Sequence, residues 1–254
     1  MTFTINLINL LIFPAGLALL ASGLLLQWAD RKLLARFQNR LGPRWFQPFA
    51  DIVKLLGKEE IHPEGSGLIL FMSLPVLALA ATLTAALYVP LFGLPPVFSF
   101  PGDLIVTIYL LSILTLCIGL AGVQTRNRFS LAGSMRIFTQ LFAYEAPFIL
   151  AILSPTVVLM LFGSAGSWEI ANLVQSASTQ PWLIWILPIT FFVALIGLMG
   201  KLELPPFDAP EAETEIVAGA LTEYSGRGLA LFSLARSVEL VVGLTLIAAL
   251  YLGG

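Results

Sequence analysis

Long stretches without a single charged side chain constrain this chain more than any other feature of its sequence. No Asp, Glu, Lys or Arg occurs in residues 1–29, 65–102, 104–125, 146–168, 170–200 or 240–254. A helix needs about 20 predominantly apolar residues to cross the hydrocarbon core of a bilayer, and several of these runs are longer. Only 11% of the residues are charged, against about 25% in a soluble domain. We therefore expect an all-α, polytopic membrane protein.

The apolar runs predict about six membrane-spanning helices within one membrane domain that occupies residues 1–254. The spans are expected at about 5–28, 68–92, 103–123, 137–162, 182–200 and 229–252. Twelve of the thirteen Lys and Arg residues fall in residues 30–64, 124–136 and 201–228, which are alternate connections. The positive-inside rule makes these connections cytoplasmic, so both termini are expected outside.

The first connection, residues 30–64, contains a second kind of helix. Phe49, Ile52, Val53 and Leu56 recur at the spacing of one helical face, and the charged residues around them lie off that stripe. The segment is too short to cross a bilayer, so it is expected to lie along the membrane surface. Two interpretations stay open: a helix that only rests on lipid, and a docking site for a soluble partner.

The last connection, residues 201–228, is acidic in a chain that is otherwise apolar. Five carboxylates fall between Asp208 and Glu223 with no Lys or Arg among them. Asp208 and Glu211 have the spacing of a capping box, and a helix from Asp208 to about Gly219 would place Glu211 and Glu215 on one face. Because neighbouring carboxylates repel, at least one of them should hold a proton more tightly. The alternative is a solvated loop that faces a partner.

Two further acidic groups lie inside predicted spans. Glu145 is expected about two turns inside the fourth span, where a carboxylate costs roughly 2.5–3.5 kcal/mol and normally faces a cavity or a partner. In the sixth span, Arg236 and Glu239 are three residues apart on one face and are expected to neutralise each other. That pair favours a structural role.

The residue types that hold most metals and redox centres are scarce. Cys117 is the one cysteine and His62 the one histidine, so neither a cysteine cluster nor a histidine-rich metal site is possible within the chain. No nucleotide-binding loop, nucleophile motif or metal motif occurs. The sequence therefore predicts no metal site, no catalytic residue and no cofactor in this chain, and nothing in it suggests binding to nucleic acid.

Three segments, taken in order, resemble one known family. The first runs from Asp30 to Glu59 and includes Gln38-Asn39-Arg40-Leu41-Gly42-Pro43. The second includes Tyr144-Glu145 and Pro147. The third runs from Pro206-Phe207-Asp208 to Glu223-Tyr224-Ser225-Gly226. Together they resemble the subunit-1 family of respiratory complex I, the NADH–quinone oxidoreductase, and its relatives in energy-converting nickel–iron hydrogenases and formate hydrogenlyase. That family usually has eight spans, so this chain is expected to be a short member or an incomplete one.

Three details favour the hydrogenase-type branch of that resemblance. Only Arg44, Trp45 and Phe46 separate Gly42-Pro43 from Gln47-Pro48, where quinone-reducing relatives carry a longer insert. Those relatives also place a Glu and then an Arg just before Pro-Phe-Asp, whereas this chain has Glu203 in a shifted register and no Arg. Finally, quinone-reducing relatives tend to have an acid at the position of Arg236.

The resemblance implies a subunit that docks a peripheral electron-transfer arm and couples electron transfer, here to protons with formation of hydrogen, to translocation of H⁺ or Na⁺. The implied partners are hydrogenase-like large and small subunits, an iron–sulfur subunit and antiporter-like membrane subunits, in the plasma membrane of a prokaryote. The nickel–iron centre and the iron–sulfur clusters would belong to those partners. The implied coupling residues are Glu145, Glu203, Asp208, Glu211, Glu213, Glu215 and Glu223. The implied docking residues are Arg31, Lys32, Arg36, Arg40, Arg44, Asp51 and Lys54.

Three other functions stay open. The same acidic connection borders a quinone cavity if the chain belongs to a quinone-reducing complex. It provides an ion site if the chain is an independent secondary transporter, although no internal repeat supports this. It takes no part in coupling if the chain is a passive anchor.

Overall fold

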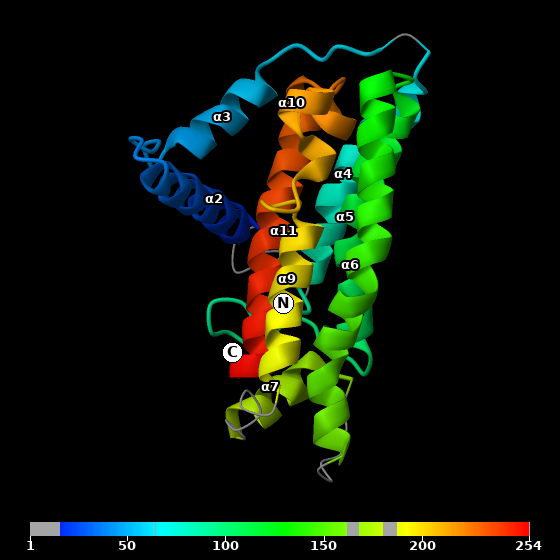
Figure 1. Cartoon of the computed structure of the whole chain (residues 1–254). Helices are drawn as coiled ribbons and strands as arrows, with labels where there is room; N and C mark the ends of the chain where they lie inside the picture. Colours follow the sequence, from blue (N-terminus) through cyan, green and yellow to red (C-terminus); the bar gives the residue numbers. More distant parts are fainter. Residues whose placement is uncertain (1–15, 64, 162–167, 180–186, 254) are drawn as a thin grey trace, which may run out of the picture.

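The computed structural model describes residues 16–63, 65–161, 168–179 and 187–253. In Figure 1, the longer helices stand side by side as an upright bundle, two more lie along one flank, and a short helix lies at the end of the bundle near the C-terminus. The bundle consists of α4 (Leu68–Ala86), α5 (Asp103–Gln124), α6 (Arg128–Leu161), α9 (Pro188–Lys201) and α11 (Gly226–Leu252). The flanking helices are α2 (Leu17–Phe37) and α3 (Gln47–Leu56), and the short helix is α7 (Ile170–Thr179).

The predicted all-α membrane fold is confirmed for the described residues. The helices α4, α5, α6 and α11 are long and apolar enough to cross a membrane, and α9 is a shorter apolar helix. Parts of the first and fifth predicted spans, residues 5–15 and 182–186, lie outside the described residues. The helix α2 continues without a break from the apolar run into the basic segment and ends at Phe37.

Two predicted connections are partly helical. Residues 128–136, which the charge pattern assigns to a connection, form the first turns of α6, because Ser130, Gly133 and Ser134 make a buried face of small residues. A Cβ on Gly133 would lie 2.5 Å from the backbone nitrogen of Ala220, so this face is in close contact with the acidic connection. Residues 170–179 form α7, whose first N–H, on Ile170, donates to Asp103 Oδ1 at 2.8 Å.

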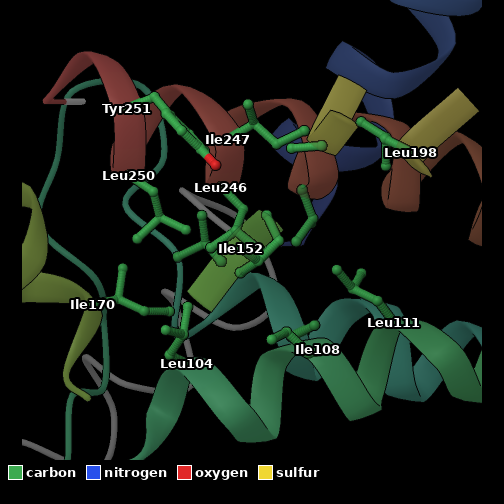
Figure 2. Packing of buried hydrophobic residues seen from close by; sticks show 14 of the residues in the cluster. Leu104, Ile108, Leu111, Ile152, Ile170, Leu198, Leu246, Ile247, Leu250 and Tyr251 are labelled. Carbon is green, nitrogen blue, oxygen red and sulfur yellow. The ribbon is translucent and has the colours of Figure 1, made fainter. Parts of the chain in front are cut away.

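The core lies between the helices of the bundle. Figure 2 shows Leu104, Ile108 and Leu111 of α5 facing Ile152 of α6 and Leu246, Ile247 and Leu250 of α11, all of them buried. The helix α11 contacts each of the other long helices, which makes it the central element of the fold. Its approach to α2 is very close, since a Cβ on Gly23 would lie 2.6 Å from the carbonyl oxygen of Ser237. Small residues at such crossings allow membrane helices to pack tightly.

The single helix predicted from Asp208 to Gly219 is wrong. The structure has three short pieces instead: η1 (Ala209–Glu211), α10 (Glu213–Ile216) and η2 (Gly219–Leu221). Ala212, with φ −52° and ψ 93°, leaves the helical conformation and separates η1 from α10. Gly219, at φ +55°, begins η2 where a Cβ would lie 2.0 Å from the carbonyl oxygen of Pro210. Backbone packing, which the local pattern does not reveal, therefore sets the path of this connection.

The short amphipathic helix is present at the predicted place. It is α3, with Pro48 in its first turn and Gly57 at its end. Ile52 is buried, whereas Val53 and Leu56 of the same stripe are exposed. The helix contacts both α11 and α2, so part of its apolar face packs within the protein and the rest stays available to lipid or a partner.

Candidate functional site

A lysine and a glutamate form a buried ion pair between α9 and α6. The Lys201 side chain, at the end of α9, is fully buried, and its Nζ lies 3.1 Å from Glu145 Oε2. The same Nζ lies 3.0 Å from Ser112 Oγ in α5, and the Ser112 hydroxyl donates to the other oxygen of Glu145. The ammonium also lies over the rings of Tyr144 and Phe148, 5.7 and 5.6 Å from their centroids. Glu145 thus has the internal partner that its place in an apolar helix requires.

One arginine of α11 holds two glutamates of the acidic connection. Arg236 donates to Glu203 Oε2 at 2.7 Å, and it also forms an ion pair with Glu211. Arg236 and Glu239 do not form an ion pair with each other, because the Arg236 guanidinium points to the turn after α9 and to η1, and the two groups interact only at longer range. Arg236 therefore joins α11 to two segments that the sequence alone could not place beside it.

The turn that follows α9 orients the Glu203 side chain toward Arg236. Glu203 follows α9 in the left-handed conformation, with φ +54°, and Leu204 N–H closes the turn onto the carbonyl of Met199 at 3.0 Å. Gln140 of α6 then fixes both sides of the turn, since its Nε2 donates to the carbonyls of Gly200 and Phe207. A non-glycine residue held at positive φ by its surroundings is often found at functional sites.

Burial changes the acidity of Glu203. Its side chain is 5% exposed, and the loss of water raises the pKa of its carboxyl to about 7, although Arg236 opposes this shift. The nearby Glu211 carboxylate raises the pKa further. Glu203 is thus able to gain or lose a proton near neutral pH.

The ion pairs of Lys201 and Arg236 form two ion-pair groups: Lys201 with Glu145, and Arg236 with Glu203 and Glu211. A buried carboxyl on α11 interacts with both groups. Glu239 is 1% exposed, and its Oε1 has no hydrogen-bond partner among the described residues. It interacts electrostatically with Lys201 and Glu145 of the first group and with Arg236 and Glu203 of the second. An ionised carboxylate is costly to bury with an unsatisfied oxygen, so Glu239 is a candidate for proton uptake when the charges around it change.

A cavity of about 820 Å³ opens beside Arg236 and its two glutamate partners. One wall is α2, with Asp30 and Arg31; the opposite wall is α11, with Arg236 and Leu240; the acidic connection contributes Glu203. The volume lies within the range of about 300–1,000 Å³ typical of small-molecule sites. The mixed apolar and charged lining suits an amphipathic molecule or ordered water.

The predicted coupling residues divide into four sets. Glu145, Glu203 and Glu211 belong to the two ion-pair groups. Asp208 is exposed and lines the cavity. Glu215 pairs with Arg136 at 2.6 Å on the outside of the bundle, and Glu223 accepts a hydrogen bond from Asn127. The side chain of Glu213 lies outside the described part of the structure.

The predicted docking residues also behave differently from one another. Arg31 and Asp51 pair with each other at 3.3 Å and tie α2 to α3. Lys32 lies over the Trp28 ring, 4.6 Å from its centroid. Arg36, Arg40, Arg44 and Lys54 are exposed. Docking of a peripheral arm to these residues stays a prediction.

Sequence reasoning missed Lys201 and Ser112 and gave Arg236 and Glu239 a merely structural role. One signal was present: Lys201 closes an uncharged run that begins at Ile170, and an ammonium there needs a counter-charge. Nothing in the sequence marked Ser112 among the other hydroxyl residues of its span. Among the described residues, no three His, Cys, Asp or Glu side chains come together to hold a metal ion.

A comparison with protein families adds independent evidence. The family model described as NADH dehydrogenase matches residues 8–254, which is nearly the whole chain. The helical membrane architecture agrees with such a match. The chain therefore belongs to the NADH dehydrogenase family of proteins like subunit 1 of complex I, as a membrane subunit of a multisubunit oxidoreductase complex.

Proposed function

We propose that this subunit couples electron transfer in a peripheral arm to ion movement through the membrane, and that its two ion-pair groups carry out this coupling. The observation that carries the proposal is Glu239, a buried carboxyl with one unpaired oxygen among the described residues that interacts with both groups. Structural ion pairs alone would leave this carboxyl unexplained, because a buried polar group normally has a partner.

The order of events follows from the charges. When Glu203 takes up a proton, Arg236 keeps Glu211 as its charged partner and loses one of two counter-charges. The surroundings of Glu239, three residues further along α11, then carry one negative charge less. A change of charge on Glu239 in turn acts on the Lys201–Glu145 pair deeper in the bundle. Coupled groups of this kind titrate as a set rather than one at a time.

We further propose that the redox partner is of the hydrogenase type. Support comes from the short segment Arg44-Trp45-Phe46 and from Arg236, which stands where quinone-reducing relatives tend to carry an acid. The partners would be hydrogenase-like large and small subunits, an iron–sulfur subunit and antiporter-like membrane subunits, in a prokaryotic plasma membrane with the acidic connection on the cytoplasmic side. Nickel and iron–sulfur centres would lie in those partners.

The test is Glu239→Gln in sealed inverted vesicles that contain the assembled complex. Electron transfer, measured as hydrogen formation, should persist, while the ion gradient should form roughly 100-fold more slowly, a typical loss for a removed proton-transfer group. Glu215→Gln is the matched control, because it makes the same change at a glutamate of this chain that pairs with Arg136 on the outside of the bundle. Normal ion transport by Glu239→Gln would refute the coupling role and leave a passive anchor. Ion transport by the chain without partners would instead identify an independent transporter.

A quinone-reducing complex is the second candidate, favoured by the cavity of about 820 Å³ beside Arg236. Leu240 and Leu244 supply an apolar wall for a quinone tail, and Arg31 and Arg236 supply hydrogen-bond donors for its carbonyl groups. Leu240→Trp would place a bulky ring in this cavity and obstruct it. If the wild-type complex forms no hydrogen and the Leu240→Trp variant loses quinone reduction, the chain belongs to a quinone-reducing complex. If the Leu240→Trp variant forms hydrogen at the wild-type rate, the chain belongs to the hydrogenase type.

A further inference from the structure

A second pocket, of about 720 Å³, lies on the other side of α2 and is lined by cations without acids. Its charged lining residues are Lys32, Arg36, Arg40 and Arg44, and its apolar ones include Trp28 and Trp45. We propose that this pocket binds the phosphate headgroup of an anionic phospholipid from the surrounding bilayer. The proposal is independent of the redox partner and of the coupling groups.

The pocket is formed by a chain reversal at the end of α2. Trp28, Lys32 and Arg36 are spaced by four residues and so lie along one face of the helix. Asn39 then adopts the left-handed conformation, with φ +56°, and Arg40 N–H donates to the carbonyl of Ala35 at 2.7 Å. The residues after Arg40 consequently run back along the same face and bring Arg44 beside the first three cations.

Two contacts hold this reversal in place. The indole N–H of Trp28 donates to the carbonyl of Pro43 at 3.1 Å. A Cβ on Gly42 would lie 3.0 Å from the Lys32 Cα, so the segment that follows Arg40 packs directly against α2. The pocket is therefore a built feature of the chain rather than a set of surface side chains that happen to be close.

Its charge is uncompensated. No described carboxylate forms an ion pair with Lys32, Arg36, Arg40 or Arg44, whereas Arg31, on the other face of α2, pairs with Asp51. Four cations around one pocket repel each other, and an anion among them would relieve that repulsion. Arginine is also the side chain whose planar group best matches phosphate oxygens.

The surroundings point to lipid rather than to a soluble anion. Leu41 and Trp45 line the pocket and are 103% and 61% exposed. The helix that carries the pocket emerges from an uncharged run, so the cations stand where that run meets water. Exposed Trp next to Lys and Arg is typical of the headgroup layer, where basic residues attract anionic lipids.

The test measures how tightly the full chain, purified with whatever subunits accompany it, keeps phosphatidylglycerol in nanodiscs of phosphatidylglycerol and phosphatidylcholine. The double variant Arg40→Gln/Arg44→Gln should retain phosphatidylglycerol roughly 30-fold less well, since each cation near a membrane surface contributes about fivefold. Lys54→Gln/Lys58→Gln is the matched control, because it removes the same charge from the same connection outside the pocket. Native mass spectrometry would count the lipids that remain bound after detergent washing.

Other outcomes would overturn the proposal. Equal loss in both double variants would mean general attraction to the membrane surface. Displacement of the lipid by millimolar inorganic phosphate would mean a site for soluble phosphate. Loss of accompanying subunits from the Arg40→Gln/Arg44→Gln protein, with lipid retention unchanged, would mean that this face docks the peripheral arm.

Discussion

The ammonium of Lys201 lies 3.1 Å from the carboxylate of Glu145, although 56 residues separate the two along the chain. The pair joins the end of α9 to the middle of α6, and Ser112 of α5 bonds to both members. Three bundle helices thus meet at one pair of opposite charges inside an apolar structure. Such a pair holds the helices together only while both charges are present, because either charge alone would be buried without compensation.

Breaking the buried pair should be strongly destabilising. Glu145→Gln deprives the fully buried Lys201 ammonium of its ion-pair partner, and removal of one partner of such a pair costs roughly 3–5 kcal/mol. The apolar double variant Glu145→Leu/Lys201→Met should recover most of that loss, because no uncompensated charge remains. Thermal unfolding in detergent would measure both. A Glu145→Gln protein that melts with the wild type would contradict the burial of Lys201.

Stability should fall as the pH rises through the titration range of Glu203. Below about pH 4.5 the carboxyl is neutral in both the folded and the unfolded chain, so its favourable contribution is fully present. Between about 4.5 and 7 the unfolded chain releases the proton and the folded chain keeps it, so stability decreases and then levels off above pH 7. The contribution at stake is on the order of 3 kcal/mol. The difference in unfolding free energy between wild type and Glu203→Gln, followed from pH 4 to 8, should show this slope.

The exposed pair of Arg136 and Glu215 should matter far less. Both side chains are more than a third exposed, and exposed pairs typically contribute about 0–1 kcal/mol. Glu215→Gln should therefore change the unfolding free energy by less than about 1 kcal/mol, and added salt should remove the difference. Arg136→Gln should cost slightly more, because Arg136 also donates to the carbonyl of Ala209 at 3.0 Å. A loss comparable to that of Glu145→Gln would mean that this pair is shielded from water in the assembled protein.

The acidic connection should loosen when Gly219 acquires a side chain. Gly219→Ala combines a positive φ with a Cβ 2.0 Å from the Pro210 carbonyl oxygen, so the backbone of η1 or η2 must move. Limited proteolysis should then cut residues 205–226 much faster than in the wild type. Gly93→Ala is the control, because it shares the positive φ but meets nothing within 4 Å. It should cost only the conformational strain, roughly 1 kcal/mol, and leave the cleavage rate unchanged. Equal cleavage of all three proteins would show that η1 and η2 do not depend on this contact.

Features that depend on local composition could be predicted from the sequence. The apolar runs predict the spans at 103–123 and 229–252 to within a few residues, since hydrophobic length is a one-dimensional property. The stripe through Ile52 predicts α3, with Pro48 and Gly57 at its ends. The demand that Glu145 have an internal partner follows from the cost of a carboxylate in an apolar helix.

Features that depend on which distant segments of the chain come into contact could not be predicted in this way. The capping pattern after Asp208 favours one helix, but contacts of Pro210 and Gly133 with η2 divide that segment into three. Arg236 and Glu239 look like partners because they share a helical face, yet two glutamates from a different segment compete for the arginine.

The order of apolar and charged residues is enough to establish a helical membrane protein with one acidic connection, because both properties can be read along a single dimension. Which charges meet is settled by the way the helices cross in three dimensions, which brings Lys201 to Glu145 and Arg236 to Glu203. Burial then determines which carboxyls carry protons, since the electrostatic cost of a charge depends on its distance from water and from its partner.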